Sequence, residues 1–192
     1  MGKVRAVCLW LGLVLLLAGC KAGGDSRMED ALAFRAQLLG GAGCSFAADI
    51  TADYGDQVYS FSVACTTDPE GALSFVVTAP ETIAGIAGTV SASGGKLTFE
   101  DTALDFGLLA DGKVSPVTAS YVMEQSWRTG YITAVGQDGD GLRLTVDSTF
   151  EENPLTVDTW LDPQKRIPIF AEVCYNGQRI LTISVSEFQF LS

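Results

Sequence analysis

Apolar and polar residues alternate along the chain from Cys44 to Cys65. The alternation pauses around Tyr54-Gly55, and its apolar members are Phe46, Ala48, Ile50, Tyr59, Phe61 and Val63. A period of two is typical of half-buried strands, so this stretch predicts two strands joined by a two-residue turn at Tyr54-Gly55. In that register Cys44 faces Cys65, and the apolar residues share one face. We expect a cross-strand disulfide between these cysteines, with two separate buried thiols as the alternative.

Further strand signals follow along the chain. Residues 71–81 predict a third strand, while Gly94-Gly95 and Asn176-Gly177 each lie between apolar runs and indicate hairpins. The Asn-Gly pair is the strongest short hairpin signal in the sequence.

Two segments have helical spacing instead. In residues 26–41, Ser26 can cap a helix and Gly40-Gly41 can end it; its predicted apolar side is formed by Met28, Ala31, Leu32, Leu38 and Leu39, with Arg35 among them. In residues 115–129, Pro116 suits the first helical position.

About nine strands and two helices, with no strand–helix–strand alternation, predict an α+β fold. We expect a large curved antiparallel sheet or half-open β-barrel with helices packed on its concave face.

The N-terminal segment has the pattern of an export signal. Lys3 and Arg5 precede an apolar run over residues 6–18, which is too short to span a bilayer. The run ends in "LAGC", which resembles the lipobox of bacterial lipoproteins, in which cleavage precedes the cysteine and its thiol receives a diacylglyceryl group. The alternative is an ordinary signal that happens to end at a cysteine. The sequence thus predicts a signal peptide over residues 1–19, a lipidated Cys20 with a flexible tether over 20–26, and one domain over 27–192, facing the extracytoplasmic side of the cell membrane.

Charge and composition narrow the range of functions. The chain has 12 basic and 23 acidic residues; removal of the signal leaves 10 basic residues and a net charge of about −13. Such a surface repels nucleic acid and anionic head groups, so the lipid on Cys20 must supply the membrane contact. We also expect a monomer.

The absence of histidine excludes a Ser-His-Asp triad and histidine metal ligands. Asp138 and Asp140 in "QDGDG" have the spacing of a calcium loop but lack its downstream glutamate, so a hairpin turn is the better interpretation. We predict no catalytic residues, no metal and no cofactor.

The order of elements resembles the bacterial lipoprotein-carrier (LolA-like) superfamily. The resemblance rests on "TAPETIAGIAGTVSASGGKLTFEDTALDF" (residues 78–106) and "LDPQKRIPIFAEVCYNGQRILTISVSEFQF" (residues 161–190), and covers roughly residues 27–190. It implies a half-open barrel whose apolar face, covered by helices, can enclose acyl chains or a lipidated peptide.

The residues that would line such a cavity alternate on the strands or lie on the second helix. They are Phe46, Phe61, Val63, Phe75, Val77, Leu97, Val122, Met123 and Trp127. The same pattern also fits a solid core, so the residues alone leave both readings open. Three functions follow: a lipid-anchored carrier of a hydrophobic ligand, a surface interaction or sensor module with a solid core, and, most remotely, a carboxylate-based hydrolase.

Overall fold

The computed structural model describes residues 26–99, 102–107, 109–110, 113–149 and 154–192. The proposed signal peptide, Cys20 and all but the last residue of the tether lie outside the described residues. Two helices are present in this part of the chain, α2 (Ser26–Gly40) and α3 (Ala119–Arg128), the second preceded by a 3-10 turn, η1 (Pro116–Thr118). Among the described residues, no helix combines the length and apolar character needed to cross a bilayer.

The strands form two antiparallel meanders. The first contains β1 (Cys44–Asp53), β2 (Val58–Thr67), β3 (Leu73–Ala79), β4 (Ala87–Ser91), β5 (Gly94–Phe99) and β6 (Thr102–Phe106). The second contains β9 (Tyr131–Asp138), β10 (Gly141–Asp147), β11 (Leu155–Leu161), β12 (Pro168–Tyr175) and β13 (Gln178–Phe190). A short separate hairpin, β7 (Leu109–Ala110) with β8 (Lys113–Val114), lies between them in sequence.

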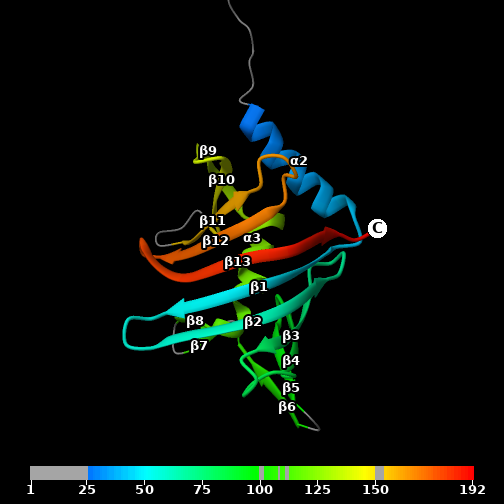
Figure 1. The fold of residues 1–192 in the computed structure, drawn as a ribbon, viewed down its shortest axis with the longest axis vertical. Coiled ribbons are helices and arrows are strands. Elements are labelled where there is room, and N and C mark those ends of the chain that lie inside the picture. The colour runs from blue at the N-terminus through cyan, green and yellow to red at the C-terminus, as the bar shows by residue number, and fades with distance from the viewer. Residues whose placement is uncertain (1–25, 100–101, 108, 111–112, 150–153) are drawn as a thin grey trace, which may run out of the picture.

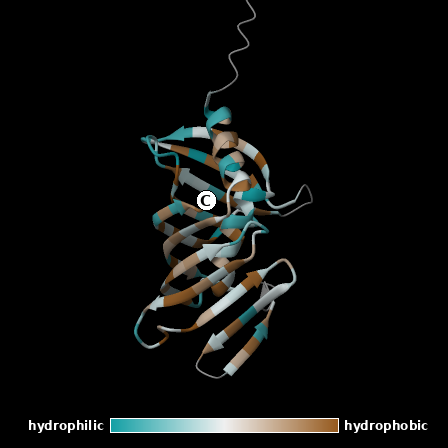
Figure 2. Ribbon diagram, turned by 90° about the vertical axis from the view of Figure 1, so that its right-hand side faces the viewer, coloured by the Kyte–Doolittle hydropathy of each residue, from teal (hydrophilic) through white to brown (hydrophobic). Residues whose placement is uncertain are grey.

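Pairing of β1 with β13 joins the two meanders into one sheet of 11 strands in the order β6-β5-β4-β3-β2-β1-β13-β12-β11-β10-β9. Because β6 and β9 lie at opposite edges, the chain crosses from one edge to the other through α3 (Figure 1). Apolar and polar residues alternate along the strands (Figure 2), as one buried face requires. The predicted α+β fold with a large curved antiparallel sheet is confirmed.

The first hairpin has a different register from the predicted one. Its loop spans four residues, with the Tyr54 N–H donating to the Gln57 carbonyl at 3.0 Å, and Asp53 pairs with Val58. Cys65 therefore faces Phe46. A shift of two residues keeps each side chain on its face of the sheet, so the buried face was predicted correctly although the partners were not.

The other hairpins agree more closely with the sequence. Asn176 and Gly177, with φ of 51° and 73°, form the two-residue turn between β12 and β13. The turn between β4 and β5 is at Ala92-Ser93, because the Gly94-Gly95 pair begins β5 rather than forming the loop. At Gly95 an added Cβ would stand 2.2 Å from the Phe106 ring, so this glycine is needed for the ring to lie across the strand.

Helix α2 packs through only part of the predicted apolar side, together with Phe34, which was not predicted to belong to it. Its buried residues are Ala31, Phe34 and Leu38. Leu32 and Leu39, predicted for the apolar side, are 50% and 53% exposed. The helix has two apolar stripes, one with Phe34 and one with Leu32 and Leu39. The stripe with Phe34 is buried, because this ring packs against Trp127 of α3 and Phe188 of β13.

Candidate functional site: the concave face beneath helix α3

Helix α3 forms where the sequence predicted a helix. Pro116 begins the 3-10 turn that leads into it, and Arg128 is its last residue. Gly130 follows directly; an added Cβ there would stand 2.2 Å from Val146 Cγ1, so only glycine lets the chain turn this close to β10. The helix is held against the concave face of the sheet, the face that the carrier hypothesis requires for a ligand.

The structure brings all nine predicted lining residues into one hydrophobic cluster. Six of them are at most 3% exposed, namely Phe46, Val63, Phe75, Val77, Met123 and Trp127. The remaining three are partly buried against the same cluster, namely Phe61, Leu97 and Val122. The six buried side chains are thus enclosed by their neighbours in this cluster, as the side chains of a solid core are.

Trp127 lies at the centre of this cluster. Its ring lies 5.7 Å from Phe34, 6.0 Å from Phe46 and 6.0 Å from Phe188, measured between ring centroids. The indole N–H donates to the Thr159 hydroxyl at 3.0 Å, which satisfies the one polar atom of the side chain. Phe34 and Phe188 were missed by the sequence analysis; the spacing of Phe34 from Ala31 and Leu38 is the signal that could have found the first.

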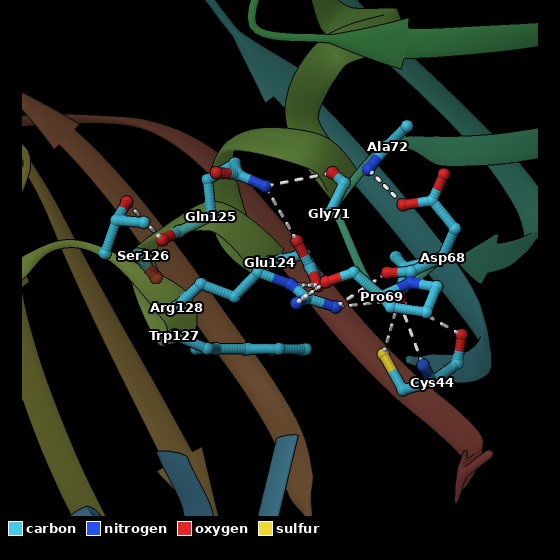
Figure 3. Close-up of polar contacts among 12 residues, drawn as sticks. Cys44, Asp68, Pro69, Gly71, Ala72, Glu124, Gln125, Ser126, Trp127 and Arg128 are labelled. Atoms are coloured by element: carbon cyan, nitrogen blue, oxygen red, sulfur yellow. Dashed lines mark hydrogen bonds and ion pairs between the residues drawn. The ribbon is translucent and has the colours of Figure 1, made fainter. Parts of the chain in front are cut away.

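A buried ion pair fixes the C-terminal turn of α3 (Figure 3). Glu124 and Arg128, one turn apart, form a direct ion pair, and their side chains are 0% and 5% exposed. Burial raises the pKa of Glu124 above its ordinary value, and hydrogen bonding and charge attraction from Arg128 oppose this shift. In sequence the pair looks like an ordinary exposed pair on a helix surface, so its role was not predicted.

The same side chains attach α3 to the loop between β2 and β3. Arg128 donates to the carbonyls of Asp68 at 3.0 Å and Pro69 at 3.1 Å, and the Gln125 amide donates to the Gly71 carbonyl at 3.0 Å. Gly71 has φ of 86°, and a Cβ there would stand 2.8 Å from the Gln125 amide nitrogen. The loop therefore lies directly against the helix (Figure 3).

Helix α2 is joined to the same turn from the other side. Arg35 donates to the Trp127 carbonyl at 2.7 Å and the Ser126 carbonyl at 3.0 Å. These carbonyls belong to the last turn of α3, which has no intrahelical donors for them. The two helices and the β2–β3 loop are thus joined by polar contacts next to the aromatic cluster around Trp127.

Among the described residues, the concave face has one small pocket beside α3. This pocket of about 160 Å³ lies between α3 and strand β11, and its apolar wall includes Val122, Leu155 and Val157. Ligand pockets in proteins generally occupy about 300–1,000 Å³. This space is too small for a long acyl chain in the described conformation.

A larger hollow lies on the opposite, outer face of the sheet. It measures about 520 Å³ and is formed by β2, β3, β4 and β5. Small side chains and hydroxyls line it, with one lysine: Ala64, Thr66, Ser74, Val76, Thr89, Lys96 and Thr98. Short side chains on four neighbouring strands leave room here for groups from another molecule.

The predicted disulfide between Cys44 and Cys65 is wrong in this structure. Both thiols are free, and the register places Thr67 and not Cys65 beside Cys44. The Cys44 N–H donates to the Thr67 hydroxyl at 2.9 Å, and the Cys44 sulfur lies 3.4 Å from the same hydroxyl. Burial raises the pKa of Cys44 to about 11 and that of Cys65 to about 12. The alternative of two separate buried thiols describes the structure.

We expect these two thiols to resist alkylation in the folded protein. The thiolate is the reactive form, and burial both suppresses it and blocks access. Native protein treated with iodoacetamide near neutral pH should take up no label at Cys44 or Cys65, and both should be labelled in denaturant without a reductant. A linked peptide containing both cysteines in the mass spectrum of unreduced protein would contradict this.

Acidic residues of the strands and turns have structural roles. Asp138 and Gly141 pair across the turn at Gly139-Asp140, which confirms the hairpin at "QDGDG". Among the described residues, no three cysteine or acidic side chains gather as metal ligands. Asp158 faces Glu172 on the outer face of β11 and β12, and each is bound by an arginine, as pairs Arg143–Asp158 and Arg179–Glu172 at 2.7 and 2.8 Å. These form a cross-strand ion-pair ladder and not a pair of acids in a cleft.

The fold defines an α+β protein with one open, curved antiparallel sheet whose concave face is covered by two helices. No family model matches the sequence, and no curated protein matches it. Several solved structures share the architecture at low sequence identity. A domain assigned to outer membrane lipoprotein sorting from Vibrio parahaemolyticus has a TM-score of 0.48 and 11% identity, over 86% of this chain and 92% of that one.

Two further structures extend this comparison. A LolA superfamily protein from Nitrosomonas europaea has a TM-score of 0.41 and 10% identity, over 84% of this chain and 93% of that one. A chain from the complex of the CwlD amidase with the GerS lipoprotein of Clostridioides difficile has a TM-score of 0.42 and 13% identity, over 85% and 95%.

Proposed function

We propose that this chain is a membrane-tethered, extracytoplasmic binding domain that acts without catalysis and holds a protein partner. The filled concave face carries this proposal. Met123 and Trp127, two residues expected to line a ligand cavity, are both 0% exposed and do not line the pocket of about 160 Å³ between α3 and β11. A carrier of long acyl chains needs several times this space.

The attachment of α3 also argues against a cover that opens. Lifting the helix would separate the buried charge of Arg128 from Glu124 and from the β2–β3 loop, and would break the bond from Arg35 to the Trp127 carbonyl. Leaving a buried charge without its partner is strongly unfavourable. The outer hollow of about 520 Å³ requires no such rearrangement, so it is the better place for a partner to bind.

The lipid content of the purified protein tests the proposal. Residues 21–192 would be produced in bacteria, purified without detergent, and studied by native mass spectrometry followed by solvent extraction. We expect an empty, stable protein that does not bind a fluorescent fatty acid. A stoichiometric acylated ligand would overturn the proposal in favour of a carrier.

Membrane tethering is expected to depend on Cys20. In the full chain, Cys20→Ser should release the protein from the membrane fraction, because the strongly acidic domain has little attraction of its own for anionic lipid. Cys174→Ser is the matched control and should stay membrane-bound. Equal retention of both variants would disprove lipidation at Cys20.

A hydrophobic-ligand carrier is the second candidate, favoured by the apolar wall of the pocket between α3 and β11. Leu155→Trp should fill this pocket, so any binding of a short-chain fatty acid by the wild-type protein should be lost in the variant. Leu104→Trp, at an exposed position on β6, is the control that should leave such binding unchanged.

A further inference from the structure

Helix α2 has a second apolar stripe that the domain leaves uncovered. Leu32 and Leu39 are 50% and 53% exposed, and they lie seven residues apart, so they point in nearly the same direction. Met28 and Ala36 are each four residues from Leu32, so they lie on the same side of the helix. The buried stripe of Ala31, Phe34 and Leu38 lies about a third of a turn around the helix from them, so the exposed leucines are not part of the packed side.

The position of α2 in the chain keeps this stripe near the proposed lipid anchor. Ser26 begins the helix and follows Cys20 by six residues, which extend at most about 22 Å. The 15-residue helix is itself about 22 Å long. A lipid at Cys20 would therefore keep the start of α2 within about 22 Å of the head groups, which allows the helix to lie along the membrane surface.

The charges around α2 are nearly balanced, unlike those of the chain as a whole. Four basic residues lie on the helix or in the adjoining turn after β11, namely Arg27, Arg35, Lys165 and Arg166, against three acidic residues, Glu29, Asp30 and Asp162. Arg166 and Asp30 join the turn to the helix through an ion pair of 2.6 Å. Since the whole chain carries −11, this end is repelled less by an anionic bilayer than a surface with the average charge density.

We propose that the exposed stripe of α2 lies in the head-group region of the bilayer and forms a second membrane contact. The inference rests on the tethering proposed above. The stripe is too small for firm binding alone, but a tether makes the second contact intramolecular and so raises its effective concentration. Because α2 and strands β3–β5 lie at opposite ends of the molecule's long axis (Figure 1), this contact would direct the outer hollow away from the membrane.

Fluorescent labelling of the lipidated full chain tests the contact. An environment-sensitive probe would be attached through Leu32→Cys or Leu39→Cys in a Cys174→Ser background, where Cys44 and Cys65 are buried. The protein would be placed in vesicles of phosphatidylethanolamine and phosphatidylglycerol containing spin-labelled lipid. Gln37→Cys, an exposed position on another side of the same helix, is the control. We expect blue-shifted, quenched emission at positions 32 and 39, and water-like, unquenched emission at position 37.

Two additional measurements separate this contact from the anchor. The intact mass of the membrane-derived protein reports lipidation of Cys20 independently of the probe. The same labelled variants, starting at Lys21 with an N-terminal hexahistidine tag, can be held on vesicles by nickel-chelating lipid, because the described fold lies within residues 26–192. Quenching at positions 32 and 39 in the protein held by nickel-chelating lipid supports the contact of α2 with the bilayer even if Cys20 carries no lipid. Water-like emission at all three positions in tethered protein overturns it.

The double variant Leu32→Gln/Leu39→Gln checks that the stripe has no role within the domain. Its thermal unfolding midpoint should equal that of the parent, because both side chains are about half exposed. On nickel-lipid vesicles, a probe on Met28→Cys should be quenched in the parent but lose most of its quenching in this variant. Unchanged quenching would overturn the role of the leucines.

Discussion

Replacement of Arg128 by methionine is expected to lower the free energy of unfolding by about 3–5 kcal/mol, the usual cost of leaving one member of a buried ion pair alone. Glu124 would lose its buried partner, and the carbonyls of Asp68 and Pro69 would lose their donor. Because small domains are stable by only about 5–15 kcal/mol, this is a large share of the total. Urea unfolding followed by circular dichroism measures it.

The effect of Arg128→Met should depend on pH in a defined direction. Burial already raises the pKa of Glu124 above 4.5 in the folded protein, and removal of Arg128 takes away the influences that oppose this rise. A group whose pKa is raised by folding contributes most stability below its unfolded pKa and loses that contribution as pH rises through the folded value. The loss of unfolding free energy relative to the wild type should therefore be smaller below about pH 4.5, where Glu124 is protonated in the folded and the unfolded state. This loss should grow toward neutral pH.

Arg179→Met is the matched control for this prediction. Arg179 also pairs with a glutamate, Glu172, at 2.8 Å, but its side chain is 60% exposed. Exposed pairs contribute little to stability because solvent screens them, so this variant should unfold almost like the wild type. Equal losses of unfolding free energy in the two variants would show that burial of the Glu124–Arg128 pair does not increase its contribution to stability.

Trp127→Ala is expected to cost about 3–5 kcal/mol and to open an apolar space on the concave face. The side chain is fully buried among three phenylalanine rings, and its N–H satisfies Thr159. Truncation removes the ring contacts and leaves the Thr159 hydroxyl without its donor. Denaturant unfolding measures the loss, and Trp160→Ala, a partly exposed ring on the outer face, should lose less.

The same variant tests whether the aromatic core occupies the place of a ligand. An engineered apolar cavity of about 150 Å³ can bind benzene, and a ligand that binds only the folded state raises its stability. Benzene at near-saturating concentration should raise the unfolding midpoint of Trp127→Ala more than that of the wild type. An equal shift in both proteins would mean that the wild-type concave face already holds accessible space, which would favour the carrier function.

The sequence by itself determined the fold class, the number of helices in the described residues, and which face of β1, β2 and β3 is buried. Alternation specifies the face of a strand but not its partner, because a shift of two residues preserves the face. For this reason Phe46 and Val63 were placed correctly in the core, while Cys44 was paired with the wrong residue.

Only the tertiary structure decided how the helices dock and whether the concave face is open. Helix α2 has two apolar stripes, and contact of Phe34 with Trp127 selects the buried one. The pattern that predicts a ligand cavity is the same as the pattern of a solid core, since both need apolar side chains at alternate positions. Packing of side chains from distant segments, Phe34, Trp127 and Phe188, resolves this ambiguity, because the filling of a space depends on all its walls together.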